Sequence, residues 1–199
     1  MWLPAPLQAT TSAINSTPMT APTPSDAHGP QGPILGHLPL NDFATVVRSA
    51  PLVSIDLVVV RNHSHILLGQ RSNRPAQGYW FVPGGRIYKN ETMQQAQRRI
   101  AESEIGITPD LLETSLKPQW LGAYEHFYAD SFAAQNAVTT HYVALAHLLH
   151  VPESFEPAHR DAQHQAWRWW PLQQALSSPE VHHFSQSYVR DLQQPRVCK

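Results

Sequence analysis

The chain has 199 residues, of which 42% are hydrophobic and 15% are charged, and its formal net charge at pH 7 is -1. This length suits one domain with an ordinary core, and the near-zero charge excludes a protein-wide field that would attract nucleic acid or an anionic membrane. The single cysteine, Cys198, excludes a disulfide framework and a cysteine-based zinc site. No apolar run approaches the roughly 20 residues of a membrane span. We therefore expect a cytoplasmic protein that binds neither nucleic acid nor membrane.

The first 40 residues differ in composition from the rest. They contain 8 of the 18 prolines, and Asp26 is their only formally charged side chain. Pro, Thr, Ser and Ala dominate without apolar periodicity, which is typical of a segment that cannot bury enough surface to fold. The segment also lacks the basic start and apolar stretch of a secretory signal. We expect residues 1–40 to be a disordered tail, residues 41–199 to form the domain, and deletion of residues 1–38 to change little.

Patterns typical of strands and helices alternate along the expected domain. The expected strands are residues 52–60, 66–68, 79–82, 120–128, 139–149 and 166–170, and the expected helices are residues 92–105, 171–176 and 184–192. Thr92 and Gln95 form the capping-box pattern of a helix start, and Gly106 is suited to the helix end. Strands outnumber helices and the last element is helical, which favours an α+β fold with helices around a mixed sheet.

The helix expected at residues 92–105 carries an acid on its apolar face. Its 3.6-residue repeat places Glu104 in one stripe with Met93, Ala96 and Ile100. A lone buried carboxylate costs several kcal/mol, so Glu104 must meet a cation. The repeat alone leaves two alternatives open, which are a nearby arginine (Arg98 or Arg99) and a metal ion.

The loop before this helix resembles the Nudix box, whose pattern is G-x5-E-x7-R-E-U-x-E-E-x-G-U with U aliphatic. The matching residues are Gly85, Glu91, Arg99 and the run Glu-Ile-Gly-Ile at residues 104–107. The strand, loop and helix expected from the patterns are the context that this motif requires.

Two positions depart from the ordinary box, because Ile100 and Ser103 stand where the pattern has glutamates. Only Glu104 remains of the three carboxylates that the pattern gathers on one helix face, and Glu102 is expected to face away from it. Mg²⁺ prefers near-octahedral oxygen coordination. Further ligands must therefore come from outside the box.

These departures and the flanking residues resemble the GDP-mannose mannosyl hydrolase branch of the Nudix family. The resemblance covers residues 42–190, and its longest marker is the run Asn-Arg-Pro-Ala-Gln-Gly-Tyr-Trp-Phe-Val-Pro-Gly-Gly-Arg at residues 73–86. Shorter markers lie at residues 42–49, 126–128, 139–143 and 163–164. The resemblance implies a Nudix α/β/α sandwich, a homodimer, and hydrolysis of GDP-mannose or GDP-glucose to GDP and the free sugar.

The same resemblance implies a metal site and a catalytic base. Its metal ligands would be the Glu104 carboxylate, the Gly84 carbonyl and the Gln163 side chain, together with substrate diphosphate, around Mg²⁺ or alternatively Mn²⁺. His164 matches the general base that activates water for attack on the anomeric carbon with inversion. An imidazole that titrates near neutral pH suits this role.

Cations are needed where negative charge develops on the departing diphosphate. The resemblance assigns this role to Arg71 and Arg86, and guanidinium groups bind phosphate in a bidentate manner. The further substrate-contacting or supporting positions are Asp56, His126 and Tyr142, of which His126 has no role that the sequence defines. Arg99 is expected to bind Glu91 in the loop and not the substrate.

Two other functions remain open at this point. A Nudix pyrophosphatase would cut the P–O–P bond of a nucleotide sugar, but the missing glutamates weaken that reading. A degenerate domain would bind a nucleotide without turnover, but the presence of Glu104, Gln163 and His164 argues against it.

Overall fold

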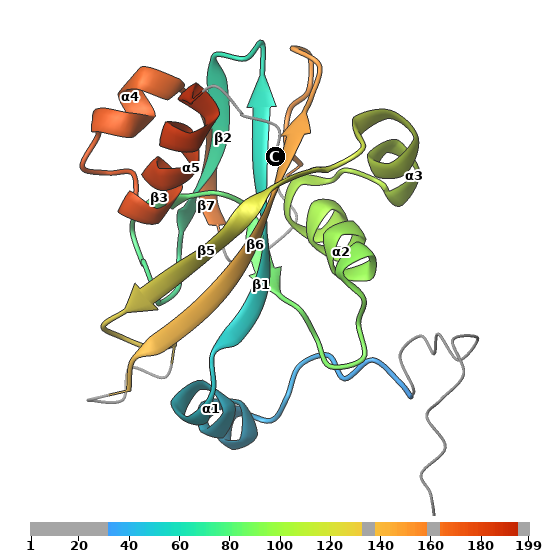
Figure 1. Ribbon diagram of the computed structural model, residues 1–199, viewed down its shortest axis with the longest axis vertical. Helices are drawn as coiled ribbons and strands as arrows, with labels where there is room; N and C mark the ends of the chain where they lie inside the picture. Colours follow the sequence, from blue (N-terminus) through green and yellow to red (C-terminus); the bar gives the residue numbers. More distant parts are fainter. Residues whose placement is uncertain (1–31, 133–137, 159–163, 195–199) are drawn as a thin grey trace, which may run out of the picture. The chain divides into compact units, whose positions relative to one another are not determined.

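A mixed sheet of seven strands forms the centre of the computed structural model, which describes residues 32–132, 138–158 and 164–194 (Figure 1). Five strands lie in the order β3–β2–β1–β6–β5, while β4 pairs with β1 and β7 pairs with β2. The strands are β1 (Leu52–Arg61), β2 (His65–Arg71), β3 (Trp80–Phe81), β4 (Gly84–Arg86), β5 (Gln119–Tyr128), β6 (Thr140–His150) and β7 (His164–Pro171). The β1–β6 pair is parallel and the other pairs are antiparallel, which confirms the expected mixed sheet.

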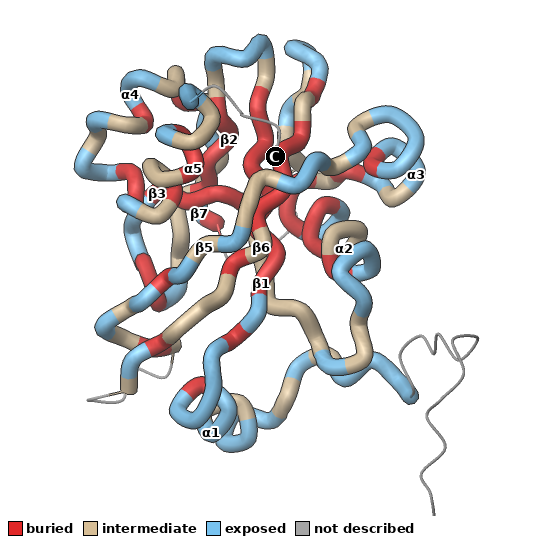
Figure 2. Tube along the Cα trace, in the orientation of Figure 1, coloured by how far each residue is buried: buried red, intermediate tan, exposed pale blue. Residues whose placement is uncertain are grey.

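Helices cover both faces of the sheet. They are α1 (Leu40–Ser49), α2 (Met93–Ile105), α3 (Pro109–Leu111), the single π-helical turn η1 (Leu112–Leu116), α4 (Leu172–Ser177) and α5 (His183–Gln193). Alternate residues of β1 enter two cores: Leu57 packs with α2 on one face, and Val58 packs with α4 and α5 on the other (Figures 1 and 2). This layering confirms the expected α+β sandwich. None of the helices in the described ranges is long and apolar enough to cross a membrane.

The start and end of α2 follow the local sequence signals. The Thr92 hydroxyl accepts from Gln95 N–H, and the Gln95 side chain accepts from Thr92 N–H, so the expected capping box is present. Gly106 ends the helix with φ +75°, a left-handed conformation that glycine adopts without steric cost. The strand expected at residues 66–68 extends to Arg71, because β3 and β7 pair with its two edges at Gly69.

The folded unit begins earlier than the sequence predicted. The described residues from Gly32 onward belong to one compact unit, in which Leu35 pairs with Lys89 and the Asn90 side chain donates to the Pro33 carbonyl. Residues 32–40 therefore pack on the domain, which corrects the prediction of a disordered tail through residue 40. Residues 1–31 and the predicted metal ligand Gln163 lie outside the described residues.

Candidate active site

A cavity of about 470 Å³ lies where β1 changes its pairing partner. β1 pairs with β2 next to the turn that joins them, at Val60 and Ile66, and pairs with β4 nearer its start, at Asp56 and Gly84. The cavity is lined by these strands and by residues of α2, β5 and β6. The sequence-predicted site residues in its lining are Asp56, Arg71, Gly84, Arg86, Glu104, His126 and Tyr142.

The Glu104 carboxylate joins α2 to β4 at the cavity wall. Its Oε2 accepts from the Gly84 N–H at 2.8 Å, and the residue is only 3% exposed. A Cβ at Gly84 would lie 2.8 Å from Asp56 Oδ1 and 2.9 Å from the Ile55 carbonyl oxygen, so only glycine allows this approach of β1 and β4. The carboxylate and the Gly84 carbonyl are hard oxygen donors of the kind that fit Mg²⁺.

The helix face shown to the cavity has a single carboxylate. Ile100 is buried in the core beneath α2, Ser103 lines the cavity, and Glu102 is exposed. The predicted orientation of Glu104 and Glu102 is therefore confirmed. Within the described part of the chain, no three His, Cys, Asp or Glu side chains form a group that could hold a metal ion. The Glu104 carboxylate and the Gly84 carbonyl would leave most positions around a divalent ion to other ligands.

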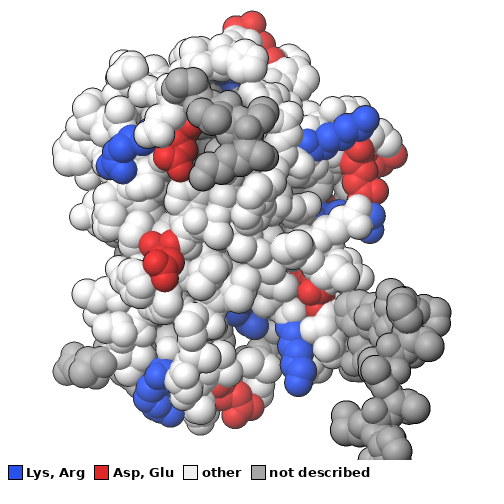
Figure 3. Space-filling view, in the orientation of Figure 1, with Lys and Arg blue, Asp and Glu red and all other residues white. Residues whose placement is uncertain are grey.

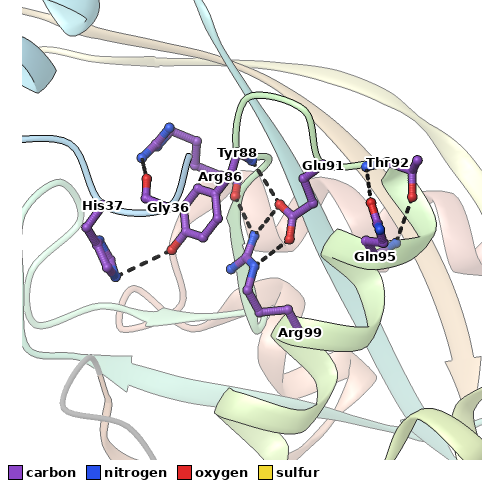
Figure 4. A network of polar contacts seen from close by, with 8 residues as sticks. All are labelled: Gly36, His37, Arg86, Tyr88, Glu91, Thr92, Gln95 and Arg99. Carbon is purple, nitrogen blue, oxygen red and sulfur yellow. Dashed lines mark hydrogen bonds and ion pairs between the residues drawn. The ribbon is translucent and has the colours of Figure 1, made fainter. Parts of the chain in front are cut away.

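Arg99 holds the loop before α2 by hydrogen bonds, and its positive charge also interacts with Glu104. It donates to both Glu91 carboxylate oxygens, at 2.7 and 2.8 Å, and to the Arg86 carbonyl at 2.8 Å (Figure 4). Burial raises the pKa of Glu91, but the hydrogen bonds from Arg99 and from the Tyr88 N–H outweigh it, and the net pKa is lowered. Arg98 pairs with Glu113 instead. The expected Arg99–Glu91 pair is thus confirmed.

Two arginines enter the cavity from different strands. The Arg71 Nε donates to the Pro75 carbonyl at 2.9 Å, and the Arg86 guanidinium lies 4.9 Å from the centroid of the Phe43 ring and 4.8 Å from that of Tyr88. Paired guanidinium groups suit a diphosphate. The face in Figure 3 shows no continuous basic patch, so on that face positive charge is not gathered into a broad anion-binding surface.

A buried hydrogen-bond network links β1, β5 and α5 at the cavity wall. The Tyr188 hydroxyl of α5 donates to Asp56 Oδ2 at 2.7 Å, and Ser54 Oγ donates to Asp56 Oδ1 at 3.2 Å. Since the Tyr188 proton is directed to Asp56, His126 Nε2 at 3.1 Å acts as the donor to the Tyr188 oxygen. His126 therefore supports Asp56 through Tyr188, a role that the sequence did not define.

Asp56 and His126 in this hydrogen-bond network have pKa values far from the ordinary values of their side chains. Burial raises the pKa of Asp56 to about 6, against weaker lowering by hydrogen bonds from Tyr188 and Ser54. Burial lowers the pKa of His126 to about 3, and the nearby His182 adds to the effect. Near neutral pH, His126 is accordingly uncharged and Asp56 is mostly ionised.

Sequence reasoning missed two tyrosines at the site. Tyr128 lines the cavity beside Tyr142, with ring centroids 6.3 Å apart, and Tyr188 is fully buried. Burial raises the pKa of all three phenols, so they remain protonated donors. The marker at residues 126–128 pointed to Tyr128. The only signal for Tyr188 was its place within the helix expected at residues 184–192.

His164 lies apart from the cavity lining. It begins β7, opposite Arg71 in the β2–β7 pair, and it is 5% exposed. Its ring centroid lies 4.4 Å from that of Trp167, and a Cβ at Gly69 would come within 2.4 Å of the imidazole. The structure therefore places His164 over Gly69, on the strand pair that carries Arg71.

Comparisons with known proteins agree with this architecture. Residues 50–192 match the model of the NUDIX domain family. The crystal structure of a MutT NUDIX hydrolase from Burkholderia pseudomallei is 27% identical, has a TM-score of 0.55, and covers 72% of this chain and 98% of its own.

Two curated relatives have more specific names. The low-salt glycan biosynthesis protein Agl8 of Haloferax volcanii is 40% identical over 109 residues, which is 55% of this chain and 65% of the relative. The oxidized purine nucleoside triphosphate hydrolase of Danio rerio is 32% identical over 84 residues, which is 41% of this chain and 54% of the relative. The chain thus matches less than two thirds of the length of either relative.

Proposed function

This chain belongs to the NUDIX domain family, and we propose that it hydrolyses GDP-mannose, with GDP-glucose as a second substrate, to GDP and the free sugar. In the proposed reaction, the oxygen of water bonds to the anomeric carbon and the bond between that carbon and the phosphate oxygen breaks. The departing GDP takes the bonding electron pair, a base takes the water proton, and the anomeric configuration inverts.

The observation that carries this proposal is the single carboxylate that α2 shows to the cavity. Attack on phosphorus in the ordinary family relies on the cluster of box glutamates, whereas here Ile100 is part of the core and Ser103 takes the other position. Attack on carbon needs fewer carboxylates around the metal. It needs more positively charged side chains around the leaving diphosphate. Arg71 and Arg86 supply two cations in the same cavity.

Glu104 and the Gly84 carbonyl are the proposed protein ligands of Mg²⁺ or Mn²⁺, with Gln163 as the ligand from outside the described residues. The ion would neutralise charge on the leaving diphosphate. Arg71 and Arg86 would bind the diphosphate directly, and Tyr142 would donate its hydroxyl to a phosphate oxygen.

His164 remains the proposed base, on the resemblance of the pair at residues 163–164. His126 is the other histidine to consider, and it lines the cavity. Its Nε2 is engaged by Tyr188, and its pKa of about 3 makes it a weak acceptor for the water proton. A supporting role for His126 therefore fits the structure better than a role as base.

The name of the Haloferax volcanii relative supports a role in glycan metabolism. The name of the Danio rerio relative favours a second candidate, hydrolysis of a nucleoside triphosphate at phosphorus. Agl8 shares more of its sequence with this chain, and the single carboxylate on the face of α2 that lines the cavity disfavours the second candidate.

Product analysis of purified protein with GDP-mannose and Mg²⁺ separates these functions. The proposal predicts GDP and mannose. GMP and mannose 1-phosphate would indicate a pyrophosphatase, and turnover confined to nucleoside triphosphates would indicate the second candidate. Binding of GDP-mannose without any turnover would indicate a non-catalytic module. We also propose a cytoplasmic homodimer, which sedimentation of the purified protein can test for its oligomeric part.

A further inference from the structure

Residues 32–39, here called the strap, run along the loop between β4 and α2 (Figure 1). Leu35 N–H donates to the Lys89 carbonyl at 3.1 Å, and the Asn90 side chain donates to the Pro33 carbonyl at 2.9 Å. A Cβ at Gly32 would lie 3.4 Å from Asn90 Nδ2, an ordinary van der Waals distance, so the strap and the loop are neighbours there too. Backbone and side-chain hydrogen bonds thus hold the strap against this loop.

The strap also contacts the residues that shape the cavity. The Arg86 Nη2 donates to the Gly36 carbonyl at 3.2 Å, and His37 Nε2 lies 3.5 Å from the Tyr88 hydroxyl (Figure 4). The imidazole of His37 packs edge-on against the ring of Tyr88, with centroids 5.7 Å apart. His37 and Leu38 themselves line the cavity. The strap therefore forms part of the cavity wall.

Arg86 is held from three directions as a result. The Phe43 and Tyr88 rings flank its guanidinium at 4.9 and 4.8 Å, and the Gly36 carbonyl accepts one of its N–H groups. A long side chain loses rotamer freedom when it binds an anion, and holding it in place beforehand reduces that cost. The remaining guanidinium N–H groups can bind a diphosphate in the cavity.

We infer that the strap is a positioning element of the substrate site, which holds Arg86 ready for the diphosphate of a nucleoside diphosphate compound. The inference rests on the proposed function for the assignment of Arg86 to the diphosphate. It replaces the expectation that residues 1–38 can be deleted without effect. His37 buttresses Tyr88, and the Gly36 carbonyl contacts Arg86 directly.

The test is a double-mutant cycle in the full chain. In one variant, residues 33–38 are replaced by alternating glycine and serine, which keeps the length and removes the His37 ring and the conformational order of the strap. The dissociation constants of GDP and of inorganic pyrophosphate, each with Mg²⁺, are measured by calorimetry. We expect the replacement to weaken binding of both probes about tenfold, because Arg86 loses its preorganisation.

The decisive arm combines the strap replacement with Arg86→Ala. If the strap acts through Arg86, replacing it in the Arg86→Ala background changes the dissociation constants less than about twofold, since coupled residues are not additive. Equal weakening in both backgrounds, or none in either, would overturn the inference. Failure of both probes to bind the unmodified protein would overturn it as well.

Single substitutions distinguish a positioning effect of the strap from misfolding caused by the six-residue replacement. Asn90→Gly removes the bond to the Pro33 carbonyl and keeps the left-handed backbone (φ +66°) that glycine tolerates, so it should weaken probe binding by about two- to fourfold. His37→Ala should have an effect of similar size, whereas His63→Ala, in the turn after β1, should have none. Matched effects of His37→Ala and His63→Ala would contradict the role of the strap. These experiments measure binding of GDP and pyrophosphate and not turnover. If the protein hydrolysed GDP-mannose to GMP, the proposed function would be refuted, but the role of the strap would still be decided by the binding measurements.

Discussion

At the scale of single residues, the site depends on an acid that the helix buries at the cavity wall. Glu104 is 3% exposed and accepts from the Gly84 N–H, whereas Glu102, two residues earlier, is exposed. A carboxylate in this position is useful only if a cation neutralises it. The structure therefore assigns unequal importance to two glutamates that look alike in the sequence.

We predict that Glu104→Gln and Glu102→Gln differ sharply in metal activation. Glu104→Gln removes the charged ligand and should lower kcat/KM on the order of 100-fold, with a higher Mg²⁺ concentration for half-maximal rate. Glu102→Gln should change either quantity less than about twofold. Titration of the hydrolysis rate with Mg²⁺ measures both. Similar losses in the two variants would show that the helix face is wrongly assigned.

A second residue-scale prediction concerns the hydroxyl of Tyr188. Tyr188→Phe leaves Asp56 and His126 without their shared partner, and an unsatisfied buried group costs about 1–3 kcal/mol. Tyr124→Phe is the matched control, because the Tyr124 ring packs against that of Tyr188 and its hydroxyl donates to Asp191. Urea unfolding should show the larger loss of stability for Tyr188→Phe. A larger loss of stability for Tyr124→Phe than for Tyr188→Phe would contradict a central role for the buried hydrogen-bond network of Asp56, Tyr188 and His126.

At the scale of elements, features that local sequence determines were predicted and features that join distant segments were not. The capping box of Thr92 and Gln95 and the Glu91–Arg99 pair involve residues within one loop and helix, so spacing alone revealed them. The bond between Tyr188 and Asp56 joins residues 132 positions apart, and no local pattern encodes it.

Neither α1 nor the strap was predicted as an element. Phe43, Val46 and Val47 do follow a helical repeat in α1, although only Val47 is buried, and the segment was noted only for its resemblance to the family. The strap has no periodicity at all, because it is fastened by backbone and side-chain hydrogen bonds to Lys89 and Asn90. Its glycine and proline content therefore did not distinguish it from a free tail.

The end of α2 gives an element-scale prediction. Gly106 and Gly78 both have positive φ (+75° and +84°), but a Cβ at Gly106 would lie 2.7 Å from Ala158 Cβ, whereas none of the neighbouring atoms would lie within 4 Å of a Cβ at Gly78. Gly78→Ala should cost about 1–2 kcal/mol of stability from backbone strain alone. Gly106→Ala should cost more, because the clash adds to the same strain. Thermal unfolding of the two variants measures the difference, and equal costs would contradict the close packing at the end of α2.

At the scale of the whole molecule, the cavity gathers residues from β1, β2, β4, α2, β5 and β6, and α5 supports it from behind. The change of pairing partner along β1 opens the space, and the two helical layers bring Glu104 and Tyr188 to it from opposite faces. Folding and the assembly of the site are therefore one process. Groups that titrate abnormally in the site also affect global stability.

We predict that acid destabilises the fold below about pH 6.5. Burial lowers the pKa of His126 to about 3 and that of His182 to about 4. As the pH falls below 6.5, these histidines are therefore protonated in the unfolded state while they stay neutral in the native state, and this difference favours unfolding. Their stabilising effect is present above pH 6.5 and is lost toward pH 4. The raised pKa of Asp56, about 6, acts in the opposite direction below pH 6 and cancels one of the two protons.

The free energy of unfolding in urea at pH 7.5 and at pH 5.0 tests this balance. One net proton corresponds to about 1.4 kcal/mol per pH unit, so a fall of roughly 1–3 kcal/mol is expected. His182→Asn should reduce the fall, because it removes one of the two histidines whose pKa is lowered by burial. A stability that rises toward pH 5.0 would contradict the sign of the argument.

In the proposed reaction water attacks carbon and not phosphorus, and an isotope-labelling experiment distinguishes these two sites of attack. GDP-mannose is hydrolysed by the unmodified protein with Mg²⁺ in ¹⁸O-labelled water. The products are separated, and their masses are measured by mass spectrometry. We expect the label to enter the free sugar and GDP to remain unlabelled. Label in the phosphate of a product would contradict attack at the anomeric carbon.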